Sequence, residues 1–226
     1  MSEGRAGGRR KTSRDWFVDE DYEERIRGLL GGEIVDLVRS VDLEELRKRN
    51  PVEEEKFERV LTLAEELGRL VVDELVKASD EDLPGSSVAE KAGAFLDVFG
   101  SLVKRLSDKH LFDLAVKLNA RIPWLSAHEF ADPGGPYEFT LTCDYTRETN
   151  WRDMVAVHPR GAYEAAAKNR DLLGGYDVAV IAYALYLEGE EEFAEKLMSF
   201  DEAEKKWFEL KNMLGSIRER RNLPGR

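Results

Sequence analysis

The sequence predicts a mainly α-helical protein, a multi-helix bundle with one β-hairpin inserted at about residues 137–158. Three observations lead to this prediction. Apolar residues recur at intervals of three and four over most of the chain, three segments open with an N-cap residue followed three positions later by Glu, and one segment alternates between apolar and polar residues. The first two patterns are typical of helices, and the third is typical of a strand.

The N-terminal region predicts two amphipathic helical segments. Apolar residues at helical spacing begin after Asp19 and end before Gly31-Gly32, because paired glycines disfavour a helix interior. A second segment covers residues 33–49. Asp42 is a candidate N-cap, so we expect this segment to break in two there.

A long helix is predicted to follow. Asn50 is a candidate N-cap, Pro51 suits the first helical position, and Glu53 closes a capping box with Asn50. Apolar residues then hold one face as far as Ala78, which is about seven turns. Ser87 and Glu90 form a second capping box, which predicts the next helix.

The following helix is expected to begin at Ser107 and to end before the breakers that surround residues 121–136. Residues 137–145 then alternate strictly, with an apolar side chain at every second position, which predicts a strand. Residues 154–157 are its nearest candidate partner, and Thr146–Asn150 would form the turn. We expect this hairpin to lie on the helices, because an isolated hairpin is only marginally stable.

The pattern becomes helical again in the C-terminal third. Helices are expected at residues 162–173 and 176–187, separated by Gly174-Gly175. A last helix opens with Ser199 and carries apolar residues in steps of four and three. This spacing is that of a heptad seam, which packs on one partner helix within the chain or in a second copy.

Composition limits the class of protein. The chain has 226 residues, of which 42% are hydrophobic. We expect a disordered basic arm at residues 1–14, and at residues 15–226 either a single helical domain or two lobes that meet near 121–136. A single Cys excludes a disulfide framework, and no apolar run approaches the roughly 18 residues of a membrane span. A cytoplasmic protein without a membrane partner is therefore expected.

Two further features of the composition concern temperature and cofactors. Glutamine is absent, and Arg and Glu outnumber Lys and Asp by 21 to 13 and 29 to 17, as is typical of thermophiles. The sequence contains no P-loop, no Gly-x-Gly-x-x-Gly, no His-Glu-x-x-His and no Glu-x-x-His. With three His and one Cys, we expect no metal and no other cofactor.

Charge is distributed unevenly along the chain. The formal net charge is -12, but residues 1–14 hold five basic residues against one acidic residue, and residues 205–226 hold seven against two. The region between them is therefore strongly acidic and repels phosphate. Any contact with nucleic acid is expected to run through the two basic ends.

Two of the three histidines follow an arginine at a short interval. Four residues separate Arg105 from His110, and five separate Arg152 from His158. Both pairs resemble the Arg-x4-6-His motif of the HEPN family of helical ribonucleases. The resemblance implies metal-independent cleavage of RNA, usually across a dimer interface, in which His moves the 2′-hydroxyl proton and Arg holds the phosphate. Leu106 departs from the family, which usually has a polar residue at that position.

Two functions from different classes stay open. The sequence favours a non-enzymatic helical scaffold or accessory subunit that binds a protein or ribonucleoprotein partner, with RNA contact through the basic ends and a homodimer through the C-terminal helix. The alternative is the metal-independent endoribonuclease. Trp16 and Phe17 would be partner anchors or, alternatively, a staple that pins the first helix. The candidate partner-binding residues are Arg9, Arg10, Lys11, Trp16, Phe17, Trp207, Arg218 and Arg221.

Overall fold

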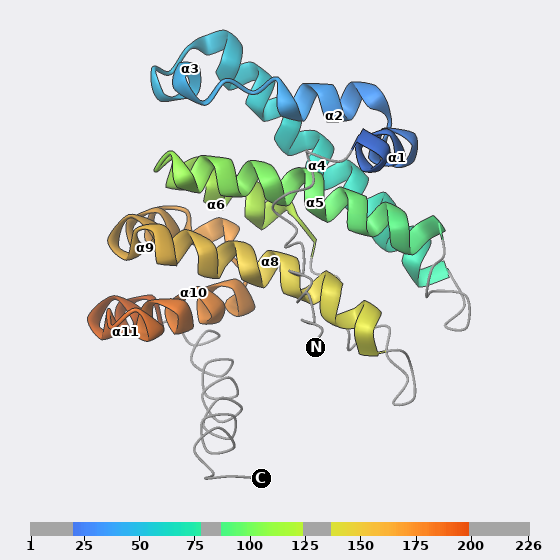
Figure 1. Ribbon diagram of the computed structural model, residues 1–226. Coiled ribbons are helices and arrows are strands. Elements are labelled where there is room, and N and C mark those ends of the chain that lie inside the picture. The colour runs from blue at the N-terminus through green and yellow to red at the C-terminus, as the bar shows by residue number, and fades with distance from the viewer. Residues whose placement is uncertain (1–19, 78–86, 124–136, 199–226) are drawn as a thin grey trace, which may run out of the picture.

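The computed structural model describes residues 20–77, 87–123 and 137–198, and every element in these ranges is helical (Figure 1). The mainly α-helical prediction is therefore confirmed. The elements are α1 (Glu20–Leu30), α2 (Gly32–Arg39), α3 (Leu43–Arg47), α4 (Pro51–Lys77), α5 (Ser87–Asp108), α6 (Phe112–Arg121), α8 (Tyr137–Val157), α9 (Pro159–Lys168), a 3-10 helix (Arg170–Leu172), α10 (Gly175–Leu187) and α11 (Glu191–Met198).

From α4 onward the helices stack in chain order. The helix α4 lies against α5, α5 against α8, and α8 against α10. The shorter helices run beside them, with α6 against α9 and α9 against α11, so that Figure 1 shows successive layers from blue to orange. Stacked helix pairs of this kind are the arrangement found in α-solenoids.

The helix α5 is central to the fold, because it contacts α1, α2, α4, α6 and α8. Its apolar face is correspondingly wide. Phe95, Phe99, Leu102 and Leu106 are completely covered by the neighbouring helices. The helix α10 is apolar on nearly all sides, as expected for a helix enclosed by others.

Several predicted helix boundaries are confirmed. Asp42 caps α3, because its carboxylate accepts hydrogen bonds from the backbone N–H groups of Glu44 and Glu45. Asn50 caps α4 by accepting from the N–H of Val52 at 3.0 Å. The predicted capping box between Asn50 and Glu53 is wrong, however. Glu53 accepts instead from the N–H of Asp42 at 2.6 Å, which ties the start of α4 to the start of α3.

The predicted start of a helix at Ser107 is wrong. The helix α5 continues to Asp108, and the Ser107 hydroxyl donates back to the carbonyl of Val103 inside the same helix. The next helix, α6, begins at Phe112. A serine within a helix can form this bond to the preceding turn as readily as it can cap a new helix, so the residue type did not decide between the two.

The predicted β-hairpin at residues 137–158 is also wrong, because α8 occupies residues 137–157 as one helix. Arg147, Trp151, Met154 and Val155 are buried at helical spacing, and α8 packs against both α5 and α10. A helix satisfies its own backbone, whereas the expected strand required a partner. The burial of this face outweighs the alternation of the preceding residues, which is a weaker local preference.

The predicted turn at 146–150 instead supplies a buried ion pair. Arg147 on α8 donates through Nε and Nη2 to the two carboxylate oxygens of Asp177 on α10, at 3.1 and 2.8 Å. Trp151 Nε1 donates to the same carboxylate at 2.8 Å, and the backbone N–H of Gly174 donates at 3.1 Å. Each oxygen of Asp177 thus accepts two hydrogen bonds, although the residue is only 2% exposed.

This cluster also reaches α6. Arg147 Nη1 donates to the carbonyl of Ile122, and Asn119 on α6 donates to the carbonyl of Arg147 at 3.2 Å. Burial lowers the pKa of the Arg147 guanidinium, and the adjacent Asp177 carboxylate opposes that shift. The cluster therefore joins α6, α8 and α10 through charges that are paired and hydrogen-bonded, which is the condition for burying them.

The first helix is held on α5 by a different polar contact. The Tyr22 hydroxyl donates to the Asp97 carboxyl at 3.0 Å, and Arg25 forms an ion pair with Glu90. Burial raises the pKa of Asp97 to about 7, while the hydrogen bond from Tyr22 acts in the opposite direction. Burial, reinforced by the charge of Asp97, also raises the pKa of Tyr22, so its hydroxyl stays protonated.

Replacing Asp177 with Asn tests the buried ion pair. Asp177→Asn keeps the shape of the side chain but leaves Arg147 charged and buried without a counter-charge, so we expect a loss of about 3–5 kcal/mol in the free energy of unfolding. Urea unfolding followed by circular dichroism measures this. The control is Glu164→Gln, which removes the partner of Arg160 in an exposed ion pair and should leave the midpoint nearly unchanged. Equal effects of the two substitutions would contradict a structural role for the pair.

The contact between Tyr22 and Asp97 predicts a specific dependence of stability on pH. Asp97 titrates at about 7 in the folded protein but near 3.8 in the unfolded chain. Between these values only the folded protein holds the proton, so the contribution of this group to stability is full below about pH 4 and is lost as the pH rises through about 7. Urea unfolding across this range should show wild type losing roughly 2 kcal/mol relative to Asp97→Asn between about pH 5 and 8. Parallel profiles for the two proteins would refute the raised pKa.

Candidate functional site

The two histidines that the sequence singled out lie together. His110 occupies the turn between α5 and α6, and His158 occupies the turn between α8 and α9. Because the layers stack in order, both turns lie at the same end of the molecule, on the left in Figure 1. The two ring centroids are 5.6 Å apart, with the ring planes at 72°. The ring of Phe112 contacts both, at 5.4 Å from His110 and 6.0 Å from His158.

His158 also stabilises the start of α9. It is the N-cap of α9, and its Nδ1 accepts a hydrogen bond from the backbone N–H of Gly161 at 2.9 Å. An accepting Nδ1 places the proton of the neutral ring on Nε2. Gly161 is required at its position, because a Cβ there would lie 2.7 Å from the ring of Phe112. The capping contact and the aromatic packing therefore depend on each other.

His110 lies in the left-handed region, with φ at 57°. The N–H of Leu111 donates to the carbonyl of Leu106 at 2.8 Å, and the N–H of His110 donates to the carbonyl of Ser107 at 2.9 Å. This pair of bonds is the Schellman motif, in which glycine usually occupies the left-handed position. Arg49, with φ at 60°, has the same role after α3.

His110 and Arg49 line one groove between α4, α6 and α9, with a volume of about 800 Å³. They are also the two non-glycine residues with positive φ in the described ranges. The charges along the groove are mixed, with five carboxylates against four cations. The carboxylates are those of Glu54, Glu55, Glu58, Asp113 and Glu164, and the cations are Arg47, Arg49, Lys117 and Lys168.

The structure does not bring either arginine of the two motifs to its histidine. Arg105 donates to the carbonyl of Val41 at 3.0 Å, toward α2 and α3, and lines pockets there rather than the groove of His110. Arg152 is exposed on α8 and forms an ion pair with Glu148 at 3.6 Å. Each of these two histidines therefore lies beside the other histidine, and neither lies beside the arginine of its motif.

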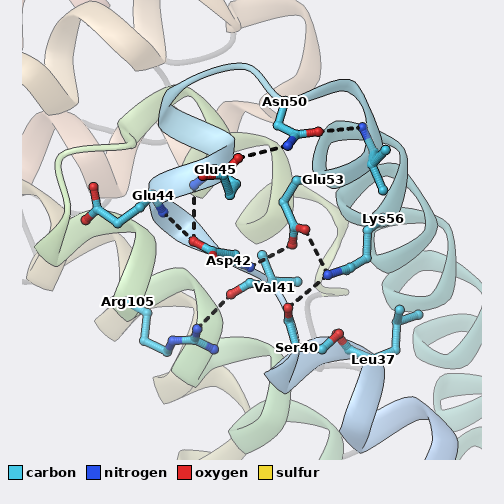
Figure 2. A network of polar contacts seen from close by, with 11 residues as sticks. Leu37, Ser40, Val41, Asp42, Glu44, Glu45, Asn50, Glu53, Lys56 and Arg105 are labelled. Carbon is cyan, nitrogen blue, oxygen red and sulfur yellow. Dashed lines mark hydrogen bonds and ion pairs between the residues drawn. The ribbon is translucent and has the colours of Figure 1, made fainter.

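Figure 2 shows the surroundings of Arg105. Its guanidinium reaches from α5 to the backbone between α2 and α3. On the other side of this segment, Lys56 of α4 donates to the carbonyl of Ser40 at 3.0 Å and to Glu53 at 2.8 Å. The turn between α2 and α3 is thus held from two sides, by Arg105 and by the polar residues at the start of α4.

The remaining site predictions concern other parts of the chain. The candidate partner-binding residues at positions 9–17 and 207–221 lie outside the described residues. Within the described ranges, the structure has no group of three or more His, Cys, Asp or Glu side chains that could hold a metal ion. No described helix has both the length and the apolar character needed to cross a membrane.

The sequence reasoning missed the cluster of Arg147, Trp151 and Asp177. The one available signal was Asp177 three residues after Gly174, the position from which a side chain reaches back to the N-terminus of a helix. Fold and site together define an α-helical protein of stacked helix pairs, with a pair of adjacent histidines at one end and a groove that His110 lines. No protein-family model, curated protein or solved structure matches the chain.

Proposed function

We propose that the protein is a non-enzymatic helical scaffold or accessory subunit that binds a protein or ribonucleoprotein partner. Stacked helix pairs support this proposal, because such stacks present extended surfaces suited to binding another macromolecule. The helices that form the stack are joined by buried contacts such as the one between Arg147 and Asp177, which favour a rigid support.

The balance of charge in the groove favours the scaffold over the ribonuclease. The groove that contains His110 has more carboxylates than cations, and three of its four cations are already paired, Arg47 with Glu44, Arg49 with Glu54 and Lys168 with Asp113. A nucleic-acid site requires free cations for the phosphates. The groove is therefore better suited to a protein surface than to an RNA backbone.

We propose further that the terminal segments make the contact with the partner. Residues 1–14 and 205–226 carry the excess of basic residues, and the candidate anchors Trp16, Phe17 and Trp207 lie in or beside them. Aromatic and arginine side chains contribute disproportionately to protein interfaces. RNA in a ribonucleoprotein partner would be contacted through the same basic segments.

Capture of partners by immobilised full-length protein from a lysate of the source organism tests this proposal. Reversal of the charges in the N-terminal arm, by Arg9→Glu with Arg10→Glu and Lys11→Glu, should reduce the captured partner at least several-fold, and so should deletion of residues 199–226. Treatment of the lysate with ribonuclease separates protein from ribonucleoprotein partners. The matched control reverses three exposed arginines of the described region, Arg59, Arg69 and Arg160. Capture that neither terminal change reduces would contradict the proposal.

One observation favours the ribonuclease as a second candidate, namely the proximity of His110 and His158. Two imidazoles can divide the work of RNA cleavage. The neutral ring takes the proton of the 2′-hydroxyl as its oxygen bonds to phosphorus, and the protonated ring gives a proton to the 5′-oxygen as the P–O5′ bond breaks. This division needs no metal and does not require Arg105 or Arg152.

End-labelled RNA incubated with the protein in EDTA, near its working temperature, tests the second candidate on a denaturing gel. The sharpest variant is His158→Asn, because Asn is a good N-cap and preserves the start of α9, whereas His158→Ala loses about 1 kcal/mol with the cap. His110→Asn likewise suits the left-handed position. Loss of cleavage in both Asn variants, at an unchanged melting temperature, would support catalysis. Absence of cleavage by wild type would eliminate it.

A further inference from the structure

A small pocket lies where α2 meets α5, and it shares no lining residue with the groove of His110. Its volume is about 330 Å³, the lower end of the range for small-molecule sites. Val35, Val38 and Val98 line it, and each is at most 3% exposed, so they form an apolar floor. Arg39 and Arg105 also line the pocket and place two guanidinium groups beside that floor.

The two arginines differ in their partners. Arg39 forms an ion pair with Glu23. Arg105 donates to the carbonyl of Val41 and forms no ion pair with any carboxylate of the described residues. It is partly covered, and this desolvation lowers the pKa of its guanidinium. Arg105 is thus a half-buried cation that lacks a counter-charge.

None of the described carboxylates near Arg105 forms an ion pair with it. Glu23 is shared between Arg27 and Arg39, Asp42 caps α3, and Glu44 pairs with Lys109. Asp108, one turn further along α5, is exposed and forms no ion pair with Arg105 within the described region. A guanidinium has five N–H donors in a planar fork that matches a carboxylate. The carbonyl of Val41 uses one of them.

A second pocket on the other side of Arg105 is less suited to an anion. It is lined by Asp42, Glu44 and Asp108 together with Lys109, so an incoming negative charge would meet three carboxylates. The pocket with the valine floor contains only Glu23, which is already neutralised by two arginines. An anion is therefore favoured on the valine side.

We propose that this pocket binds a small carboxylic acid with an aliphatic tail, whose carboxylate pairs with Arg105 and whose tail lies on Val35, Val38 and Val98. The carboxylate supplies the counter-charge that Arg105 lacks, and the tail covers the apolar floor. The proposal is independent of the scaffold function, because it uses neither the groove nor the terminal segments.

Titration of the isotope-labelled full-length protein with acetate, butyrate and hexanoate tests the proposal, at constant ionic strength against sodium chloride. Hexanoate should give saturable amide shifts centred on the residues that line the pocket, with Val35, Val38, Val98 and Arg105 among them. Affinity should rise along the series by up to about fourfold for each methylene that becomes buried. Equal shifts with chloride, or equal affinities for acetate and hexanoate, would overturn the proposal.

Variants of the arginine complete the test. Arg105→Met keeps an apolar stem of similar length but removes the charge, and it should weaken hexanoate binding at least tenfold. Arg105→Lys keeps a charge and should retain weaker binding, which guards against a loss caused by misfolding alone. The matched control is Arg69→Met, at an exposed arginine of α4 that pairs with Glu65, and it should bind hexanoate like wild type. Binding by Arg105→Met as tight as that of wild type would overturn the assignment.

Discussion

The arrangement of α6, α8 and α10 depends on one buried carboxylate. Asp177 accepts four hydrogen bonds, two from Arg147 and one each from Trp151 and the backbone of Gly174. Because both oxygens are fully used, the charge can be buried without leaving an unmet acceptor. The same guanidinium reaches the carbonyl of Ile122 at the end of α6. Three helices that are distant in the sequence are thereby fixed by directional bonds, whereas apolar packing alone would tolerate a shift along the helix axes.

The position of the histidine pair follows from this arrangement. The contact of α8 with α5 and that of α6 with α9 bring the turn after α5 beside the turn after α8. His110 and His158 therefore meet although 48 positions separate them. Phe112 packs beside both rings, and Gly161 is small enough to leave room for it. The groove beside them is a consequence of the layer order, since its residues come from α3, α4, α6 and α9 and from the turns before α4 and α6.

Local signals predicted local structure well, and they failed where burial reverses their meaning. Asp42 and Asn50 were recognised as caps because a cap bonds to the backbone two or three residues away. The polar run at 146–150 was interpreted as a turn, yet Arg147 within it is buried and paired with Asp177. A sequence pattern cannot distinguish a polar residue in solvent from one whose partner lies 30 positions away. The candidate site was predicted in part for the same reason: its histidines were identified, but the pairing of imidazole with imidazole depends on tertiary contacts.

Helix geometry explains why the arginine of the first motif does not accompany its histidine. Residues five positions apart on a helix are separated by about 140° around its axis, so they point to different faces. Arg105 accordingly faces α2 and α3, and α5 ends before His110, which the left-handed turn directs toward α6 and α9. The spacing that suggested one catalytic pair thus distributes its members over two surfaces of the protein. On one surface a guanidinium lacks a counter-charge beside an apolar floor, and on the other His110 lines a groove of mixed charge and lies beside the ring of His158. Arg105 and the two histidines therefore cannot act on one small ligand. The effect of a substitution at Arg105 can be interpreted without reference to the histidines.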